Sequence, residues 1–175
     1  LKHVTENIDR LTADLQDLVM EVRMVPVSQV FDRFPRLVRD LSLKKGKKIE
    51  LLLEGREIEI DRTVLDEIGE PLIHLLRNSI DHGIEAPEDR EKSNKSPTGK
   101  ITLLAQRSGD HVLIEIIDDG AGIDPEKIKA SALRKGFLSP NELDKMSKEQ
   151  LINLIYLPGF STAETVTDTS GRGVG

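Results

Sequence analysis

Along the first 25 residues, apolar positions recur with the spacing of a helix that pairs with another helix. They stand four and three residues apart in alternation, like the a and d positions of about three heptads, at Val4, Ile8, Leu11, Leu15, Leu18 and Val22. Charged and polar residues fill most of the other positions. A seam only two positions wide favours a partner helix over a sheet, although a plain helix on the surface of the domain is the alternative.

From Pro26 onward the pattern changes several times, as expected of a domain that mixes helices and strands. Pro26 ends the first helix, and residues 28–43 have the period of a second one. A basic turn, KKGKK, leads into residues 49–61. There, two runs typical of strands flank Glu54-Gly55 and predict a hairpin.

Asp61 stands where it can cap a long helix that runs to about Asp81. Pro71 is expected to kink this helix or to split it in two, because proline lacks the N–H that a helix interior needs. The polar stretch over residues 82–99 predicts a loop.

A second hairpin is predicted where the strand patterns of residues 100–106 and 111–118 flank a Ser-Gly-Asp turn. Helix starts follow at an Asp-Pro pair at position 124 and a Ser-Pro pair at 139, and SKEQ at 147–150 has the pattern of a capping box. Helices and hairpins mix without regular βαβ alternation. The pattern therefore predicts an α+β fold, a two-layer α/β sandwich whose mixed sheet is covered by helices on one face.

Composition narrows the class of function. The 175 residues carry a net charge of −6, which argues against a general nucleic-acid binder because phosphates attract a basic surface. The absence of cysteine excludes disulfides, thiolate chemistry and zinc bound by cysteine, and it fits a cytoplasmic location. No apolar run approaches the roughly 20 residues of a membrane span, so no membrane insertion is expected.

Inside the long predicted helix, the stretch HLLRNSIDHG lacks the lysine and glutamate that usually solubilise an exposed face. At 100° per residue, four polar side chains share an arc of about 100°, namely His74, Asn78, Asp81 and His82. The apolar side chains lie roughly opposite, at Leu65, Leu72 and Leu76. This helix face has two interpretations. It could form one side of a binding site, or it could be a polar helix end capped by Gly83, and the stretch alone does not decide between them.

The sequence DDGAGID directly follows the second predicted hairpin. Asp118 ends a strand, and Gly120 and Gly122 after it would let the backbone pass close to a planar ligand. The carboxylate could then accept a hydrogen bond from an exocyclic amine of that ligand. The alternative is an ordinary turn, which Asp-Gly often forms.

The end of the chain contains two more motifs. SGRGVG has glycine at alternate positions, Gly171, Gly173 and Gly175, which frees backbone N–H groups to form an anion-binding loop of the kind that holds phosphates. PGFST supplies the hydroxyl groups of Ser161 and Thr162. The alternatives are a flexible tail and a simple turn.

In this order, the four motifs are far more specific together than any one of them alone. HLLRNSIDHGIE, DDGAGID, PGFST and SGRGVG resemble the N, G1, F and G2 boxes of the GHKL ATPase superfamily, which includes histidine kinases, gyrase, MutL and a heat-shock chaperone. Within it they resemble the kinase domain of the CheA family of chemotaxis histidine kinases. LQDLVMEVRMVPVSQVFDRFPRLVRDL resembles the junction of that family's dimerisation hairpin with this domain. The resemblance covers essentially the whole chain and implies a Bergerat-type fold.

The resemblance implies that ATP and Mg²⁺ are the cofactors. Asn78 matches the asparagine whose carbonyl oxygen binds Mg²⁺, and Asp118 matches the acid that recognises the amino group of adenine, with Gly120 and Gly122 allowing its close approach. Further residues implied to contact the nucleotide are Asp81, His82, Lys127, Ser161, Thr162, Gly171, Arg172, Gly173 and Gly175. Residues 123–170 correspond to a lid over the nucleotide.

His74 and Asn78 are the implied catalytic residues. In the hydrolytic members of the superfamily a glutamate that activates water stands one turn before the asparagine, whereas this chain has His74 there. The difference favours transfer of the γ-phosphoryl group to a protein histidine, with His74 handling a proton or hydrogen-bonding the γ-phosphate region. His3 lacks the sequence context of an acceptor, and the resemblance places the acceptor on a separate histidine phosphotransfer domain.

The resemblance implies part of a dimerisation hairpin over residues 1–25 and an ATP-binding kinase domain over 26–175, without the helix and strands that follow the G2 loop in the family. The implied partners are the phosphotransfer domain, a second chain held weakly through the N-terminal helix, and a receptor and coupling-protein array reached through absent domains. Two alternatives are open, a hydrolytic ATPase and a scaffold whose nucleotide gates contacts without catalysis.

Overall fold

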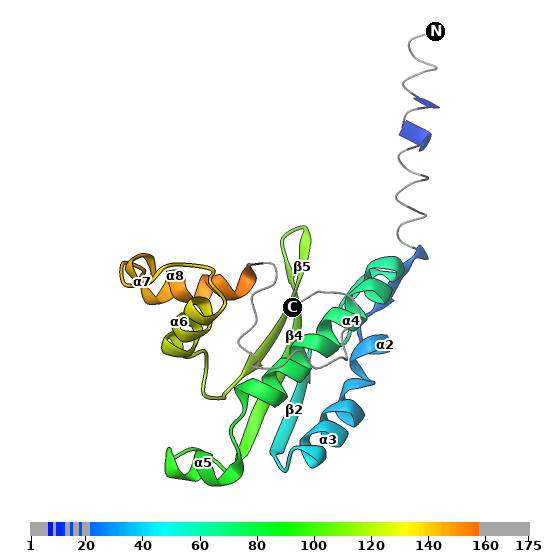
Figure 1. Cartoon of the computed structure of the whole chain (residues 1–175). Helices are drawn as coiled ribbons and strands as arrows, with labels where there is room; N and C mark the ends of the chain where they lie inside the picture. The colour runs from blue at the N-terminus through cyan, green and yellow to red at the C-terminus, as the bar shows by residue number, and fades with distance from the viewer. Residues whose placement is uncertain (1–6, 9, 13–14, 16–17, 19–21, 158–175) are drawn as a thin grey trace. The chain divides into compact units, whose positions relative to one another are not determined.

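The computed structural model describes residues 7–157 except positions 9, 13–14, 16–17 and 19–21 (Figure 1). The chain divides into two compact units, Leu1–Ala121 and Gly122–Gly175. The organisation expected from the sequence, with a division at residue 25, stays a prediction.

The first unit contains a three-stranded mixed sheet. Its strands are β2 (Lys48–Glu54), β4 (Thr98–Ser108) and β5 (His111–Asp118); β4 is central, parallel to β2 and antiparallel to β5. Strands β4 and β5 form the hairpin expected from the sequence. Gly109 has a φ of +65° in the two-residue loop between them, a conformation that glycine adopts without steric cost.

The hairpin predicted around Glu54-Gly55 is wrong. After β2 the chain leaves the sheet, and β3 (Glu59–Asp61) pairs with the short strand β1 (Met24–Pro26) in a separate two-stranded sheet. Gly55 has a φ of +69°, and a Cβ there would lie 1.7 Å from the backbone oxygen of Ala105 in β4. Glycine at this position therefore allows a close approach of two backbones and does not mark a hairpin.

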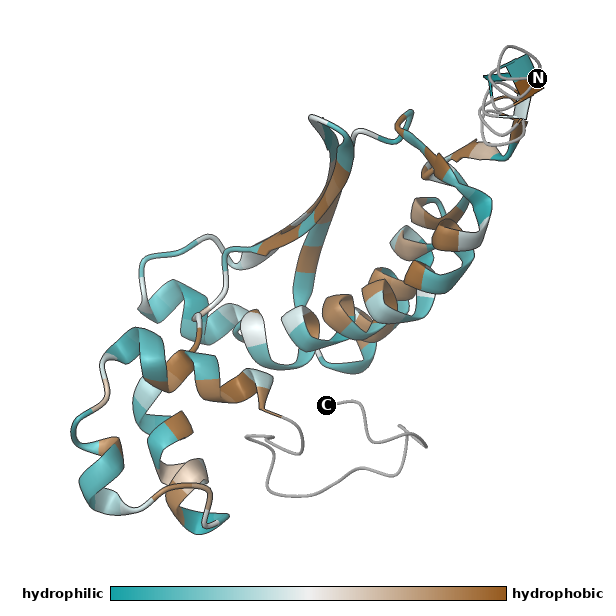
Figure 2. Cartoon of the chain, turned by 90° about the horizontal axis from the view of Figure 1, so that it is seen from above, coloured by the Kyte–Doolittle hydropathy of each residue, from teal (hydrophilic) through white to brown (hydrophobic). Residues whose placement is uncertain are grey.

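Helices α3 (Phe34–Lys44) and α4 (Arg62–Asn78) lie side by side on one face of the three-stranded sheet (Figure 1). Apolar positions, brown in Figure 2, recur along both helices and along the strands. The fully buried side chains of this core include Phe31, Phe34, Leu65, Leu76, Ile101 and Leu103. This arrangement confirms the predicted α+β fold with helices on one face of a mixed sheet.

Two prolines act differently from what their positions suggest. The helix predicted over residues 28–43 is two helices, α2 (Ser28–Phe31) and α3, because the chain turns between them and Pro35 begins the second one. Pro71, in contrast, does not split α4, which runs unbroken from Arg62 to Asn78. Pro71 is exposed, so water can hydrogen-bond the carbonyl oxygen that its missing N–H leaves free.

The second unit is helical in the residues that the structure describes. It contains α6 (Pro125–Arg134), α7 (Pro140–Leu143), α8 (Lys148–Asn153) and a 3₁₀ turn, η2 (Leu154–Tyr156). The predicted caps are confirmed: Asp124 accepts a hydrogen bond from Glu126 N, and Ser147 forms a capping box with Gln150. A separate core joins these helices, built on Ile128, Ala132, Leu143, Leu151 and Leu154.

The N-terminal seam is described in part. The described apolar residues of the seam are exposed, with fractions between 57% and 85%, at Ile8, Leu11, Leu15, Leu18 and Val22. Val4 lies outside the described residues. None of the described helices is long and apolar enough to cross a membrane.

Candidate functional site

Helix α4 carries the first of the predicted site residues, and its start is fixed by a cap. Asp61 accepts a hydrogen bond of 2.8 Å from Thr63 N, and the guanidinium of Arg23 donates to the same carboxylate oxygen at 3.1 Å. The helix then buries Leu65, Leu72 and Leu76, as the sequence predicted. This burial sets the rotation of α4 and leaves His74 and Asn78 exposed on its other side.

The helix does not end as an α-helix. Residues Ser79–Gly83 form a π turn, η1, in which Ile84 N donates to Ser79 O at 2.8 Å, five residues back. The turn buries Ser79 and Ile80 and leaves His82 exposed. Such turns insert one residue into a helix and are frequent at functional sites. The 100° spacing assumed from the sequence therefore does not hold beyond Asn78.

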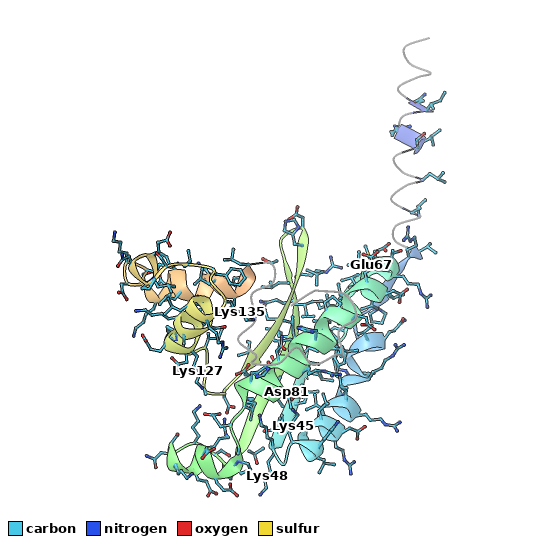
Figure 3. The ribbon with its side chains drawn as sticks, in the orientation of Figure 1. Lys45, Lys48, Glu67, Asp81, Lys127 and Lys135 are labelled. Carbon is cyan, nitrogen blue, oxygen red and sulfur yellow. The ribbon has the colours of Figure 1, made fainter. Side chains whose placement is uncertain are left out.

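Two lysines from the turn before β2 hold the π turn. Lys47 Nζ donates to the backbone oxygens of Ile80 and Asp81, at 2.6 and 3.1 Å. Lys45 Nζ forms an ion pair of 3.0 Å with the Asp81 carboxylate, and the two residues lie close together in Figure 3. Burial lowers the pKa of Lys47, an effect that the nearby Asp81 partly offsets. In this structure Asp81 is thus engaged by Lys45, and its predicted contact with the nucleotide stays a prediction.

The end of the π turn meets the G1 motif, which begins at the last residue of β5. Ala121 N donates to Gly83 O at 2.9 Å, and Gly120 N donates to Asp118 Oδ1 at 3.1 Å. The structure therefore brings the π turn that follows Asn78 next to the end of the strand that carries Asp118.

Two glycines make this meeting possible. A Cβ at Gly120 would lie 2.1 Å from Gly83 O, so only glycine allows the two backbones to pass this close. A Cβ at Gly83 would lie 3.0 Å from both carboxylate oxygens of Asp118. The missing side chain at Gly83 therefore lets the π turn pack directly against that carboxylate.

The donors and acceptors present fit a purine and a magnesium ion. Among the described residues, Asp118 Oδ2 has no hydrogen-bond partner, so it can accept a hydrogen bond from an exocyclic amine. The amide of Asn78 is exposed and unpaired with other described residues. A single amide oxygen suits Mg²⁺, which takes few protein oxygens and shares its other positions with phosphates and water. No group of three or more His, Cys, Asp or Glu side chains in the described ranges is arranged to hold a metal ion.

Behind the G1 motif lies a set of four charged residues, here called the Arg90 cluster: Glu85, Arg90, Lys95 and Asp119. Arg90 comes from the short helix α5 (Pro87–Lys92), within the stretch expected to be a loop, and its side chain is only 1% exposed. It donates to Glu85 Oε2 at 3.0 Å and to Asp119 Oδ2 at 2.8 Å. Lys95 donates to Glu85 Oε1 at 2.7 Å.

Both acids of the Arg90 cluster are held in their ionised form. Burial raises the pKa of Glu85, but hydrogen bonds from Lys95, the backbone and Arg90, together with the charge of Lys95, bring it below its ordinary value. Burial likewise raises the pKa of Asp119, and hydrogen bonds from Lys100 N and Arg90 lower it further than burial raises it. The pKa of Arg90 is raised, because its bonds to the two acids outweigh the effect of burial.

The remaining predicted residues belong to the second unit or lie outside the described residues. Gly122, with a φ of +73°, and the exposed Lys127 of α6 are part of the second unit. Six more lie outside the described residues: Ser161, Thr162, Gly171, Arg172, Gly173 and Gly175. Their part in the site stays a prediction.

Sequence reasoning missed the residues that support the site. Lys45 and Lys47 belong to the basic turn KKGKK, which was interpreted only as a turn, and the Arg90 cluster lies largely in the stretch interpreted as a loop. One signal was available for Asp119, since the doubled acid in DDGAGID places a second carboxylate beside the first. The other members are spaced too irregularly for any periodic pattern to group them.

Comparisons with known proteins agree with this geometry. The family model described as "Histidine kinase-, DNA gyrase B-, and HSP90-like ATPase" matches residues 67–175, which include the helix with His74 and Asn78 and the G1 motif. The Sensor histidine kinase CheAY of Helicobacter pylori is 52% identical, and the Chemotaxis protein CheA of Bacillus subtilis is 51% identical, each over all 175 residues of this chain. The chain spans only 22% and 26% of the length of these two relatives.

Among solved structures, the histidine kinase domain of the blue-light activated histidine kinase EL346 from Erythrobacter litoralis is 18% identical. It aligns with 58% of this chain and 45% of its own, with a TM-score of 0.41. The matches to the two curated relatives extend over the whole chain, and the family model covers residues 67–175. The chain therefore belongs to the histidine kinase-, DNA gyrase B- and HSP90-like ATPase family and is similar over its whole length to proteins named chemotaxis protein CheA.

Proposed function

We propose that the chain binds Mg-ATP and transfers the γ-phosphoryl group to a histidine on a separate phosphotransfer domain, as part of a chemotaxis phosphorelay. One observation supports the nucleotide site above the others. The π turn after Asn78 meets the strand end that carries Asp118, whose Oδ2 has no hydrogen-bond partner among the described residues. The similarity to proteins named chemotaxis protein CheA and sensor histidine kinase supports the phosphorelay.

Asp118 is proposed to select adenine. Its free oxygen accepts a hydrogen bond from the exocyclic amine, while Gly83 and Gly120 let the ring approach the backbone. Inosine has a carbonyl oxygen in place of that amine. This oxygen and the carboxylate oxygen of Asp118 are both acceptors, so no hydrogen bond can form between them. The site should therefore prefer ATP to inosine triphosphate.

Asn78 is proposed to hold Mg²⁺ through its amide oxygen, four residues after His74 on the exposed side of α4. When bound, the ion supplies positive charge that neutralises the phosphate oxygens during transfer. His82 and Lys127 are proposed to bind phosphate oxygens, together with Ser161, Thr162 and the G2 glycines. Asp81 is proposed to contribute by way of its position in the π turn.

His74 is proposed to handle a proton during transfer or to donate a hydrogen bond to the γ-phosphate. It is exposed and stands one helical turn before Asn78, where an acid could activate water. With histidine at that position, the site lacks the glutamate that the resemblance places there in hydrolytic members, so we expect transfer over hydrolysis. A second chain, a receptor array and a cytoplasmic location stay predictions from the resemblance and the composition.

The test is to incubate the chain with Mg-ATP labelled at the γ-phosphate, with and without a histidine phosphotransfer domain. Label on that domain supports the proposal, and free phosphate without it would instead support a hydrolase. Nucleotide binding with neither product would support the scaffold alternative. Asn78→Ala is expected to abolish transfer. Glu67→Ala, on the same side of α4 but nearer its start (labelled in Figure 3), is the matched control and should transfer normally.

A further inference from the structure

The Arg90 cluster contacts the G1 motif at several atoms and forms no hydrogen bond with the side chain of Asp118. Arg90 donates to the carboxylate of Asp119 at 2.8 Å and to its backbone oxygen at 3.2 Å. Lys95 Nζ donates to the backbone oxygens of Asp119 and Gly120, at 3.0 and 2.8 Å. Two cations from one loop thus hold two consecutive peptide groups of the motif.

These hydrogen bonds hold the backbone of Asp119 and Gly120, the segment that orients the side chain of Asp118. The side chain of Asp118 is oriented by the N–H of Gly120, and Gly120 is the residue whose carbonyl oxygen Lys95 binds. Asp119 is held from the other side as well, because Lys100 N donates to its carboxylate at 2.9 Å. The backbone from Asp118 to Ala121 is therefore fixed at Asp119 and Gly120 by side chains and at Ala121 by Gly83.

The charges of the cluster are balanced within it. Arg90 and Lys95 supply two positive charges, and Glu85 and Asp119 supply two negative ones, joined by contacts of 2.7 to 3.0 Å. Asp118, the neighbour of Asp119, forms no ion pair with any described residue. The two cations of the cluster are therefore paired with Asp119 and Glu85, and the Asp118 carboxylate stays available to a ligand.

The burial of the Arg90 side chain shows that it is part of the folded interior and not a surface residue. The side chain of Arg90 is 1% exposed, and a buried guanidinium is stable only when its donors are satisfied, as they are here by Glu85, Ser96 O and Asp119. The planar fork of arginine suits this set of acceptors, whereas lysine would satisfy fewer of them.

We propose that Arg90 and Lys95 are positioning residues for the recognition of adenine, acting through the backbone of Asp119 and Gly120 on the carboxylate of Asp118. This inference rests on the proposed nucleotide site. The cluster does not touch the base; it keeps the acceptor oxygen at the place where the base amine arrives. Weakening the cluster should therefore reduce the preference for adenine more than it reduces the binding of the triphosphate.

The test compares the affinities of the whole chain for ATP and for inosine triphosphate by calorimetry. Lys95→Met is the main variant because Lys95 is 34% exposed and its loss should leave the fold intact. We expect the ratio of the two affinities to fall roughly tenfold, since bonds that restrain a charged acceptor are lost. Lys95→Arg keeps a cation with several donors and should restore much of the preference.

Lys92→Met is the matched control. Lys92 lies on α5, the helix that carries Arg90, and pairs with Asp89 at 2.8 Å on the surface. Lys92→Met should leave the preference for ATP over inosine triphosphate unchanged, although it removes one positive charge, as Lys95→Met does. Asp118→Asn should abolish the preference, and adding Lys95→Met to it should change nothing further.

The outcomes separate the two proposals. Equal affinity of the wild-type chain for the two nucleotides would overturn the proposed function and this inference with it. A wild type that prefers ATP, together with a Lys95→Met variant of unchanged preference, would overturn only the inference. A parallel loss of both affinities in Lys95→Met would also overturn it, because that result indicates a general structural defect. Arg90→Lys should fold, and it should lose preference in the same way if Arg90 acts as proposed.

Discussion

At the scale of single residues, glycine at position 83 determines how closely the end of α4 approaches Asp118. A side chain as small as a methyl group would reach 3.0 Å from both carboxylate oxygens, tighter than ordinary packing. The φ of Gly83 is not in the left-handed region, so alanine would meet no backbone penalty there. An alanine substitution at this position therefore tests the steric effect of the added methyl group, without a change in backbone conformation.

Gly83→Ala is expected to weaken ATP binding by roughly tenfold, because the new Cβ would force the Asp118 carboxylate to shift from its place. Gly69→Ala is the matched control. It lies within α4 with its new Cβ 3.9 Å from Val30, and it should raise stability by up to about 1 kcal/mol while leaving affinity unchanged. Titration calorimetry and thermal unfolding measure both effects. Unchanged ATP affinity in Gly83→Ala would contradict the assignment of Asp118.

The lowered pKa values in the Arg90 cluster predict a dependence of stability on pH. The folded-state pKa of Glu85 lies below its ordinary value of 4.5, so the stability that it contributes is fully present above that pH and is lost as pH falls through the folded value. Glu85→Gln should be less stable at neutral pH, and its free energy of unfolding should fall less steeply on acidification.

Urea unfolding of Glu85→Gln and the wild type between about pH 3 and 6 measures this difference. Glu88→Gln, at an exposed position in the first turn of α5, serves as the control and should follow the wild type. Parallel curves for Glu85→Gln and wild type would show that the Lys95 and Arg90 contacts do not stabilise the ionised form.

At the scale of elements, the π turn η1 depends on a lysine that lies far from it in sequence. Lys47 caps the carbonyl oxygens of Ile80 and Asp81, which the irregular end of the helix leaves without partners in the helix itself. This arrangement couples the turn before β2 to the position of His82 and to the start of the contact with the G1 motif.

Lys47→Met is expected to destabilise the first unit by about 1–2 kcal/mol, because two hydrogen bonds from a charged donor are lost. In this variant, amide hydrogen exchange in η1 should be faster than in the wild type, and the increase should be larger in η1 than in α4. Lys48→Met, an exposed neighbour in β2, should leave exchange unchanged. If η1 exchanges at the wild-type rate in Lys47→Met, the turn does not depend on this lysine.

Elements with a local cause were predictable from the sequence, and elements with a distant cause were not. The cap at Asp61, the β4–β5 hairpin and the helix starts at 124 and 147 depend on neighbouring residues, and the structure confirms them. The partner of β3 was missed because β1 has three residues and ends in Pro26, too short for any period to reveal.

The candidate site shows the same limit. The motifs named Asn78 and Asp118, and the structure brings their elements together, but the π turn could not be foreseen because a helical wheel assumes one fixed rotation per residue. The Arg90 cluster was hidden for another reason. Its members interact through a loop whose conformation is set by the buried guanidinium itself, not by a repeating pattern.

At the scale of the whole molecule, the two units have separate cores. One is built on the helices and sheet of the first unit, and the other on α6, α7 and α8. Separate cores predict that each unit can lose its packing without the other, since cooperativity requires shared buried contacts.

Leu143→Ala should destabilise the second unit by about 2–5 kcal/mol, because Leu143 is 1% exposed and its loss leaves a cavity. Hydrogen exchange should become faster in α6 and α8 and stay unchanged in β4 and β5. The reciprocal variant Leu65→Ala, also 1% exposed, should affect the first unit alone. Loss of protection in both units from either change would show that they unfold as one.

The pairing of β2 with β4 also has a consequence in time. This ladder joins Lys48 to Thr98 with α4 between them, whereas β4 and β5 pair across a two-residue loop. Contacts that close short loops form sooner than those that close long ones, so we expect the hairpin to form first and β2 to dock last. During synthesis on a ribosome, β2 would emerge early and wait without a partner until β4 has been made.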